Sequence, residues 1–480
     1  MRAIAAAGVA LVLWSCGGHN GHAGGTPVLP AARGVSARDA ASGKIKHVVI
    51  IVQENRSFND LFYGYPGAET VTYGYDSSNR KIRLKPIGLA TAWDIDHSST
   101  AFFQACNGAG SFPGTDCRMN GFNLEYVSCG HGAPKCPDPE PQYAYVPHKE
   151  TKPYFAIAGQ YVLADEMYAS NFDASSFISH QYIISGQAES AVNYPAGIWG
   201  CANGSGNFIG MVNQQRQVKG TEVACWDPTT LGDELDAAGI SWAYYTSPVF
   251  GDGDIWSAYQ AIKHVYYGPD WKQDVITPQT TFYDDVSNGK LRAVSWITPT
   301  CENSDHAACN SSTGPQWVAS LVNAIGESPY WNSTAVFIFW DDYGGWYDPE
   351  PPALADYDGL GMRIPMLIVS AYAPGPTTAA PPADGSAAES RWAINARDET
   401  LELLRAAEQG AREHEIDEVE TFARVGDGAD AILDIAEEQR CELIVVGHTG
   451  LTGATRFLLG SVPSKVSHHA PCSVLIVRTA

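Results

Sequence analysis

One uninterrupted apolar run, Thr334–Trp340, is rich in β-branched and aromatic residues and predicts a strand buried on both faces of a parallel sheet. The run ends at two adjacent carboxylates, Asp341 and Asp342. Ligands of open α/β sheets bind beyond the carboxyl ends of the strands, so these acids are placed for a hard cation or for acid–base chemistry. Gly344 and Gly345 then allow the backbone to turn closely around a bound group. The alternative is that both acids only cap the following turn.

A second run, Val48–Val52, also predicts a buried strand and is closely followed by an acid and an amide. If both strands belong to one sheet, they bring four oxygen donors to the same edge. Such a set suits a hard divalent cation. The predicted metal ligands are Glu54, Asn55, Asp341 and Asp342.

Further along the chain, strand patterns alternate with helix patterns. Ser295–Ile297 and Arg363–Ser370 predict strands, and apolar residues at helical spacing between Trp317 and Ile325 predict a helix that ends near Gly326. Strands interleaved with helices indicate an α/β fold, arranged as an α/β/α sandwich.

The first 16 residues contain one arginine, a short apolar core and Cys16, and they read as an export signal. They also resemble a bacterial lipoprotein signal with Cys16 as the lipidated residue. Residues 17–43 are rich in Gly, Ala, Pro and His and predict a flexible tether. We therefore expect an exported protein in the periplasm, anchored to the outer membrane or secreted.

Eight of the eleven cysteines lie between Cys106 and Cys309, and their even number in an exported chain favours disulfides. A zinc cluster is the alternative, but no C-x-x-C pair occurs. Proximity along the chain suggests these couples: Cys106 with Cys117, Cys129 with Cys136, Cys201 with Cys225, and Cys301 with Cys309.

The chain of 480 residues has a net charge of −23, which disfavours nucleic acids and anionic membrane surfaces as partners. Phe172–Gln181 places two hydroxyls and a histidine in a short span, which could hold a nucleophile and a phosphate-binding partner. Taken alone, this stretch is more simply a surface turn.

Between residues 44 and 374, four short sequence motifs occur in the same order as in a known protein family. The chain resembles the bacterial phosphoesterase family of phospholipases C and acid phosphatases, whose fold is similar to that of alkaline phosphatases. The family cleaves phosphate monoesters or the phosphodiester of phospholipids. The motifs are Glu54–Phe58, Ser176–Gln181, Asn303–His306 and Trp340–Asp348.

The resemblance implies a metal ion on the four oxygen donors and Ser176 as the nucleophile. His97, His180 and His306 would bind the phosphoryl group or serve as general acid, since imidazoles donate protons near neutral pH. The metal would polarise the phosphoryl oxygens. The reaction would run through a phosphoserine that water later hydrolyses.

The chain departs from the family pattern in three places. Many members have Pro-Asn where this chain has Ile178-Ser179, which leaves Ser175 as a rival nucleophile. Many have His at the position of Pro349, so one candidate acid is missing. The final segment that usually follows Tyr372–Pro374, with a histidine and a closing helix, is absent.

Residues 375–396 predict a linker, and residues 397–480 return to alternating helix and strand patterns. This segment resembles the C-terminal part of a universal stress protein, a partial Rossmann-like α/β domain with a phosphate loop. Its loop residues are Gly447, Gly450, Gly460 and Ser461. The predicted elements are helices at Glu399–Arg412 and Gly428–Gln439, and strands at Val419–Val425, Cys441–Val446 and Cys472–Val477.

No apolar run between Pro374 and Arg397 supplies the first strand of such a domain. We therefore expect weak ATP binding or none, and either an unstable fragment or one that pairs with another chain. Universal stress proteins are typically cytoplasmic, in conflict with the export signal. We interpret the chain as a recombined or artificially joined sequence, with a natural fusion as the alternative.

The sequence thus predicts an exported, metal-dependent phosphoric ester hydrolase acting on a phosphate ester or phospholipid. No nucleic acid is expected as a partner, and membrane contact is expected only through a lipid on Cys16. The alternatives are a nucleotide-binding stress module attached to an inactive phosphoesterase scaffold, and a surface-displayed binding protein on such a scaffold.

Overall fold

The computed structural model of the chain forms two compact units, one within Pro27–Trp392 and one within Ala393–Ala480. The predicted signal, the tether and the strand Val419–Val425 lie outside the described part of the chain. The structure describes residues 44–109, 116–129, 139–196, 199–353, 357–373, 412, 428–439, 441, 443–448 and 461–478.

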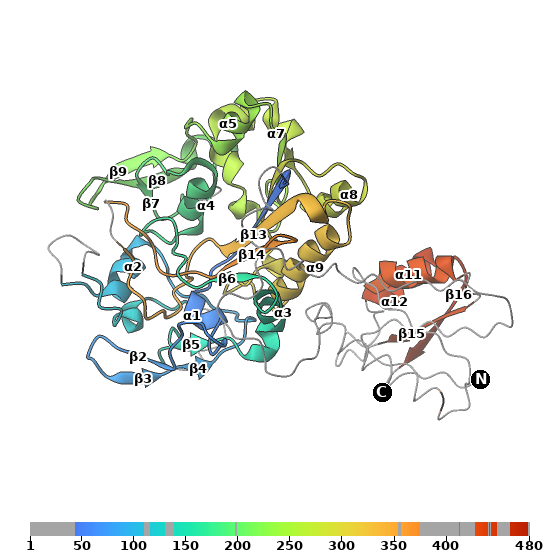
Figure 1. Cartoon of the computed structure of the whole chain (residues 1–480), viewed down its shortest axis with the longest axis horizontal. Helices are drawn as coiled ribbons and strands as arrows, with labels where there is room; N and C mark the ends of the chain where they lie inside the picture. Colours follow the sequence, from blue (N-terminus) through green and yellow to red (C-terminus); the bar gives the residue numbers. More distant parts are fainter. Residues whose placement is uncertain are drawn as a thin grey trace. The chain divides into compact units, whose positions relative to one another are not determined.

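The larger unit is built on a seven-stranded mixed sheet (Figure 1). Six strands run in the same direction, and β14 is antiparallel to both of its neighbours. The predicted α/β class is therefore confirmed. In spatial order the strands are β11 (Val275–Ile276), β10 (Trp242–Tyr245), β12 (Val294–Ile297), β1 (His47–Gln53), β13 (Thr334–Trp340), β14 (Met366–Ser370) and β6 (Val162–Ala164).

Two helices, α3 (His148–Ala158) and α9 (Gly314–Gly326), pack against each other and against β14 and β13 (Figure 1). The apolar stripe predicted for α9, which includes Trp317, Leu321 and Ile325, is buried. Burial of this stripe is what holds the helix on the sheet.

Shorter helices and small sheets surround this frame. The helices are α1 (Phe58–Leu61), α2 (Ser99–Cys106), α4 (Ser176–Ser185), α5 (Leu231–Ala237), α6 (Lys263–Tyr267), α7 (Asp270–Gln273) and α8 (Thr281–Ser287). The strands are β2 (Tyr73–Tyr75), β3 (Lys81–Arg83), β4 (Lys85–Pro86), β5 (Ala144–Tyr145), β7 (Ala191–Val192), β8 (Phe208–Val212) and β9 (Val218–Val223).

Burial alternates along β13, and this corrects the prediction that both of its faces are buried. Val336, Ile338 and Trp340 are fully buried, whereas Phe337 and Phe339 are only half-buried. Successive side chains of a strand point to opposite faces, so one face of β13 is sealed and the other is partly open. The sequence of β13 is apolar at every position after its first residue, so it gave no sign that one face is less buried than the other.

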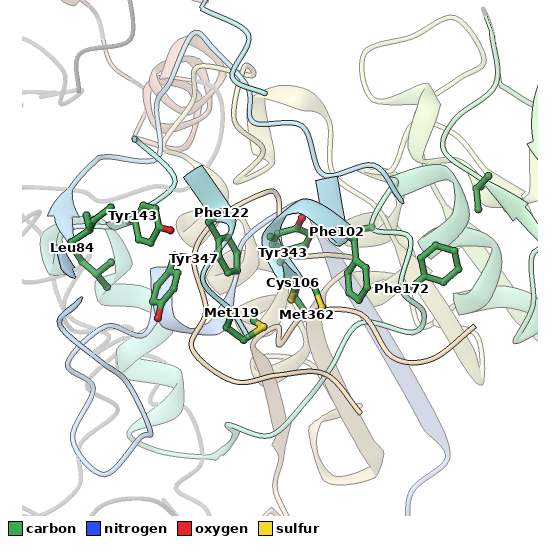
Figure 2. Packing of buried hydrophobic residues seen from close by; sticks show 14 residues of the cluster. Leu84, Phe102, Cys106, Met119, Phe122, Tyr143, Phe172, Tyr343, Tyr347 and Met362 are labelled. Carbon is green, nitrogen blue, oxygen red and sulfur yellow. The ribbon is translucent and has the colours of Figure 1, made fainter. Parts of the chain in front are cut away.

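The loop after β13 is anchored in an aromatic cluster that holds the acidic end of the strand in place (Figure 2). The ring of Phe122 lies 6.2 Å from that of Tyr343 and 5.0 Å from that of Tyr347, both in edge-on geometry. Tyr343 directly follows Asp342, so packing of its ring fixes where this carboxylate lies.

The predicted disulfides Cys106–Cys117, Cys201–Cys225 and Cys301–Cys309 are present. Cys129 is also disulfide-bonded, and its predicted partner Cys136 lies outside the described residues. These bonds exclude the zinc-cluster alternative for the six paired cysteines, and they fit an oxidising compartment.

The smaller unit contains α11 (Gly428–Glu438), β15 (Leu443–His448), α12 (Ser461–His469) and β16 (Ser473–Arg478). β15 and β16 pair in parallel, as expected for an α/β domain. Cys441 and Cys472 are free thiols; Cys441 is buried in the apolar core of this unit, and the partly buried Cys472 packs against it. Over the described parts of both units, no helix has the length and apolar character needed to cross a membrane.

Candidate active site

Two neighbouring strands deliver the predicted oxygen donors to one edge of the sheet. Gln53 at the end of β1 is in register with Trp340 at the end of β13, and Asp341 N donates to Gln53 O at 3.0 Å. Glu54 and Asp341 therefore leave the sheet side by side. The structure confirms that these two acids meet at one edge.

Asn55 lies at the centre of this group and makes several contacts through one amide nitrogen. Its Nδ2 donates to Asp342 Oδ2 at 2.8 Å and to Ser176 Oγ at 3.2 Å, and lies 3.1 Å from His97 Nε2. Its backbone has a φ of +58°, a left-handed conformation that Asn tolerates better than most residues. Such conformations persist where the surrounding structure holds them in place.

The loop after β13 approaches Asn55 so closely that only glycine fits there. A Cβ on Gly344, whose φ is +63°, would lie 2.2 Å from the carbonyl oxygen of Asn55. The glycine therefore permits a tight turn, and the group that it approaches is the backbone of Asn55. Close approach to a bound group stays a prediction.

Glu54, His180 and Asp341 form a buried group whose ligand atoms all lie within 4.8 Å of one another. His180 Nε2 is 2.7 Å from Glu54 Oε1 and 3.8 Å from Asp341 Oδ2. Among the described residues, these four each have one buried atom without a hydrogen-bond partner: Glu54 Oε2, Asn55 Oδ1, Asp341 Oδ2 and His180 Nδ1. Buried oxygens without partners are costly, and a hard cation is the partner that carboxylate and amide oxygens suit.

The electrostatics of the cluster also favour a bound cation. Burial and the nearby charges of Asp341 and Asp342 hold the pKa of Glu54 well above its usual value. Burial and the charge of Asp341 likewise hold the pKa of Asp342 well above its usual value. Crowded, desolvated carboxylates of this kind gain stability from a cation placed among them.

Burial lowers the pKa of His180 to about 4, so its imidazole is neutral near pH 7. A neutral imidazole is a metal ligand or a hydrogen-bond partner of Glu54, and it is a poor proton donor. The structure thus places His180 among the candidate metal ligands, whereas the sequence grouped it with the phosphoryl-binding histidines.

The two acids after β13 have different environments. Asp342 Oδ1 accepts from Gly344 N at 2.7 Å, which is the turn-capping role that the sequence left open for both acids. Asp341 Oδ1 accepts a long bond of 3.4 Å from Asn55 N, and Asp341 Oδ2 has no hydrogen-bond partner among the described residues. Asp342 thus caps the turn through Oδ1 and also accepts from Asn55 through Oδ2, while Asp341 faces the cluster. A metal-ligand role for Asp342 stays a prediction.

Ser176 and Ser175 are also distinguished by their contacts. Ser176, the first residue of α4, is bonded to Asn55, whereas Ser175 Oγ donates to Asp173 Oδ1 at 2.9 Å. Ser176 therefore lies beside the carboxylate cluster, at a helix N-terminus whose amides favour anions. The hydroxyl of Ser175 is engaged by Asp173 instead.

His97 and His306 lie together at the more open end of the site. Their ring centroids are 5.9 Å apart, and both residues are half-buried. His97 Nδ1 donates to Ile95 O at 2.7 Å, and His306 Nδ1 contacts Ala307 O. A carbonyl only accepts, so in each ring Nδ1 carries hydrogen. His97 Nε2 lies against the Asn55 amide, and Nε2 is the nitrogen through which either ring could meet a substrate.

Two residues that the sequence did not single out support these groups. Asp173 accepts from Ser175 and from the backbone of Asn193, so it fixes the turn that presents Ser176. Asp305 accepts from Tyr154 Oη at 2.6 Å and from Trp340 Nε1 at 3.1 Å, which ties the His306 loop to the sheet. Both residues lie inside stretches that the sequence marked, Phe172–Gln181 and Asn303–His306, but their types and spacing did not indicate these supporting roles.

The Phosphoesterase family matches residues 45–387. The chain belongs to the Phosphoesterase family. All of the site residues described above lie inside the matched range.

Several relatives within this family are phospholipases C. Non-specific phospholipase C1 of Arabidopsis thaliana is 24% identical over 69% of this chain and 61% of its own length. Phospholipase C B of Mycobacterium tuberculosis is 21% identical, covering 73% of each chain. Non-hemolytic phospholipase C of Burkholderia pseudomallei is 23% identical over 73% of this chain and 55% of its own. The chain thus spans only part of each of these relatives.

The C-terminal segment matches the Universal stress protein family over residues 365–478. Universal stress protein MT1672 of Mycobacterium tuberculosis is 36% identical, covering 25% of this chain and 80% of its own. The chain therefore carries a universal stress protein domain after the phosphoesterase domain. The two matched ranges share residues 365–387.

Among solved structures, a protein of the alkaline phosphatase superfamily from Vibrio parahaemolyticus covers 68% of this chain and 60% of its own, with 11% identity and a TM-score of 0.27. With so low a TM-score, this similarity does not support the fold, which is assigned from the strand order and the family.

The predicted phosphate loop of the C-terminal domain is only partly described. Gly447 lies in β15 and Ser461 begins α12, at the two ends of the segment that the loop would span. Gly450 and Gly460 lie outside the described residues. The structure therefore leaves the loop a prediction.

Proposed function

We propose that this chain is an exported, metal-dependent phosphoric ester hydrolase of the phospholipase C or acid phosphatase type, acting through Ser176. The observation that carries the proposal is the hydrogen bond between Asn55 and Ser176. It places the hydroxyl next to a buried group of acids with free oxygens. A nucleophile beside a candidate cation site, close to two histidines, is the arrangement that phosphoryl transfer requires.

Glu54, His180 and Asp341, with Asn55 Oδ1, would hold a divalent cation. When bound, the cation withdraws charge from the phosphoryl oxygens and favours the ionised serine. The four donors include two acids, so they bring negative charge as well as oxygen and nitrogen ligands.

Ser176 loses its hydroxyl proton to solvent and attacks the phosphorus, so that its Oγ forms the new ester bond while the bond to the leaving oxygen breaks. The leaving oxygen takes a proton from a histidine at the open end of the site. His306 and His97 are both oriented by a backbone carbonyl at Nδ1, so the histidine that donates must carry a second proton on Nε2 and becomes a neutral imidazole after the transfer. Water then attacks the phosphoserine and regenerates the hydroxyl.

Several relatives carry the name phospholipase C, which favours a phospholipid diester as the substrate. The disulfides favour a site of action outside the cytoplasm. Lipidation at Cys16 remains part of the proposal as a means of holding the enzyme at a membrane.

The second candidate function, nucleotide binding, is favoured by the match to the universal stress protein family. It concerns the C-terminal domain alone and is compatible with catalysis by the larger unit. We expect it to be weak, because the sequence supplies only part of that fold.

The test is hydrolysis of three substrates by the full chain: a chromogenic phosphate monoester, chromogenic phosphorylcholine, and phosphatidylcholine. Each is assayed as purified, after chelation, and after return of divalent ions. The proposal predicts turnover of at least one substrate, loss on chelation and recovery on metal return. Release of diacylglycerol identifies the phospholipase C reaction. Absence of all turnover in metal-replete enzyme would show that the phosphoesterase unit is inactive.

A further inference from the structure

Exposed aromatic residues stand on three loops that are attached to the open end of the active site. The side chains of Tyr126, Tyr194 and Phe250 are 67%, 62% and 69% exposed. Single exposed apolar residues are normal on a protein surface. What distinguishes these three is that each loop is bonded or packed to the surroundings of His97 or His306.

Tyr126 is attached through the strand segment that carries His97. Asp96 N donates to Tyr126 O at 2.8 Å, and Ile95 pairs with Val127 in an antiparallel bridge. Leu124, two residues earlier, is exposed as well. An aromatic and an aliphatic side chain thus lie directly beside the histidine segment.

Tyr194 is attached through its neighbour Asn193. Asn193 Oδ1 accepts from Ser99 N at 3.1 Å and from Ser99 Oγ at 2.8 Å, and Ser99 follows His97 by two residues. The backbone of Asn193 also donates to Asp173, the residue that engages Ser175. The Tyr194 loop is therefore tied both to the His97 segment and to the turn before Ser176.

Phe250 is carried by the loop after β10. This strand is parallel to β12, which is parallel to β1, so the loop leaves the sheet at the same edge as Glu54. Phe250 N donates to Asp254 Oδ2 at 2.9 Å, and the ring of Trp256 lies 5.9 Å from that of His306. Phe250 has a φ of +65°, an uncommon conformation for an aromatic residue.

We propose that Tyr126, Tyr194 and Phe250 form a rim that docks the enzyme on a zwitterionic phospholipid surface. The inference rests on the proposed function, since a diacyl phospholipid resides in an aggregate and the reacting groups here are buried. Only contact between the rim of the site and that surface would bring the ester bond to Ser176. Aromatic side chains suit this position because they favour the boundary between water and lipid.

The charges near the three aromatic residues indicate which type of lipid surface they contact. Asp96 and Asp254 lie on the same loops as two of the aromatic residues, and the whole chain carries a net charge of −23. Anionic lipids would be repelled, and a headgroup with an outer cation would be tolerated or attracted. The partner is therefore a phosphatidylcholine-type bilayer, bound through apolar contact.

The test compares the wild-type chain with a Tyr126→Ser, Tyr194→Ser, Phe250→Ser variant in sedimentation with phosphatidylcholine vesicles. Ile240→Ser is the matched control, because Ile240 is 41% exposed but precedes β10, at the opposite edge of the sheet. We expect the triple variant to bind vesicles about tenfold more weakly or worse, and the control to bind like wild type. Turnover of soluble chromogenic phosphorylcholine should be unchanged in both.

If the triple variant binds vesicles as tightly as wild type, the three aromatic residues do not form a docking surface. The same conclusion follows if Ile240→Ser loses as much vesicle binding as the triple variant. Stronger wild-type binding to phosphatidylglycerol vesicles than to phosphatidylcholine vesicles would overturn the choice of surface. Sedimentation does not depend on catalysis. If the wild type binds vesicles but hydrolyses no ester, the proposed function fails while the docking surface stands. If the wild type hydrolyses soluble esters but does not bind vesicles, the docking surface fails while the proposed function stands.

Discussion

Asn55 Nδ2 lies 3.2 Å from Ser176 Oγ and joins two segments that are 121 residues apart in the sequence. One segment is the end of the central strand β1, and the other is the first turn of α4. Through this contact the serine hydroxyl is held beside the carboxylates at the sheet edge. The bond therefore links the candidate nucleophile to the candidate cation site.

Asp341→Asn should remove one of the charged ligands without changing the size of the side chain. We expect the affinity for the divalent ion to fall by about a hundredfold or more, and turnover to fall with it. Metal titration by calorimetry and hydrolysis rates measure both. Glu54→Gln should behave in the same way.

The matched control for these variants is Asp284→Asn, an exposed acid in α8. It should retain both metal affinity and turnover. If Asp341→Asn keeps full activity while its circular dichroism is native, the ligand assignment is wrong.

The Cys201–Cys225 disulfide closes a longer segment than Cys301–Cys309, with sequence separations of 24 and 8. Loop-closure entropy predicts that replacing the first pair by alanine lowers the free energy of unfolding by about 3 kcal/mol. Replacing the second should cost about 1 kcal/mol less. Urea unfolding of the two double variants measures the difference. An equal or reversed order would show that local packing outweighs the entropy of the unfolded chain.

His264 bridges two carboxylates, with Nδ1 2.7 Å from Asp227 and Nε2 2.8 Å from Asp233. Partial burial lowers the pKa of His264, but these hydrogen bonds and charges outweigh it and raise the pKa overall. The folded state therefore binds the proton more tightly than the unfolded state. Stability from this group is fully present below the unfolded pKa of about 6.5 and is lost as the pH rises through the folded value.

His264→Gln should accordingly lose more thermal stability, relative to wild type, at about pH 6 than at about pH 9. His148→Gln serves as the control, because His148 is exposed and has no carboxylate contact among those found in the described residues. Its difference from wild type should not change with pH. A pH-independent effect of His264→Gln would mean that the imidazole acts here only by packing.

The residues at the ends of strands were the most predictable part of the site. Apolar runs identified β1 and β13, and the acids that follow them had to share an edge once the strands paired. The local disulfide couples followed from sequence proximity. In each case the partners are close along the chain or are placed by a regular element.

Contacts that depend on long loops were not predictable. Trp256 lies against His306, and Asp305 bonds to Tyr154, across segments with no periodic pattern to align them. The family resemblance implied that His180 binds the phosphoryl group or serves as general acid. Its burial against Glu54, which only the packing of α4 reveals, makes it a neutral partner of the cluster.

The C-terminal domain should bind inorganic phosphate more readily than ATP. Its sequence has the spacing of a phosphate loop but no apolar run between residues 375 and 396 to complete the sheet around a base and ribose. Calorimetry of the full chain with ATP and with phosphate tests this, using the Ser176→Ala variant to prevent turnover. Micromolar ATP binding would contradict the incomplete pocket.

Trapping the phosphoenzyme tests the central claim most directly. The wild-type chain is quenched in acid during turnover of a chromogenic phosphate ester, digested, and analysed by mass spectrometry for phosphoserine in α4. The account predicts phosphate on Ser176, none in Ser176→Ala, and continued labelling of Ser176 in Ser175→Ala. Phosphate on Ser175, or turnover by Ser176→Ala at the wild-type rate, would contradict it.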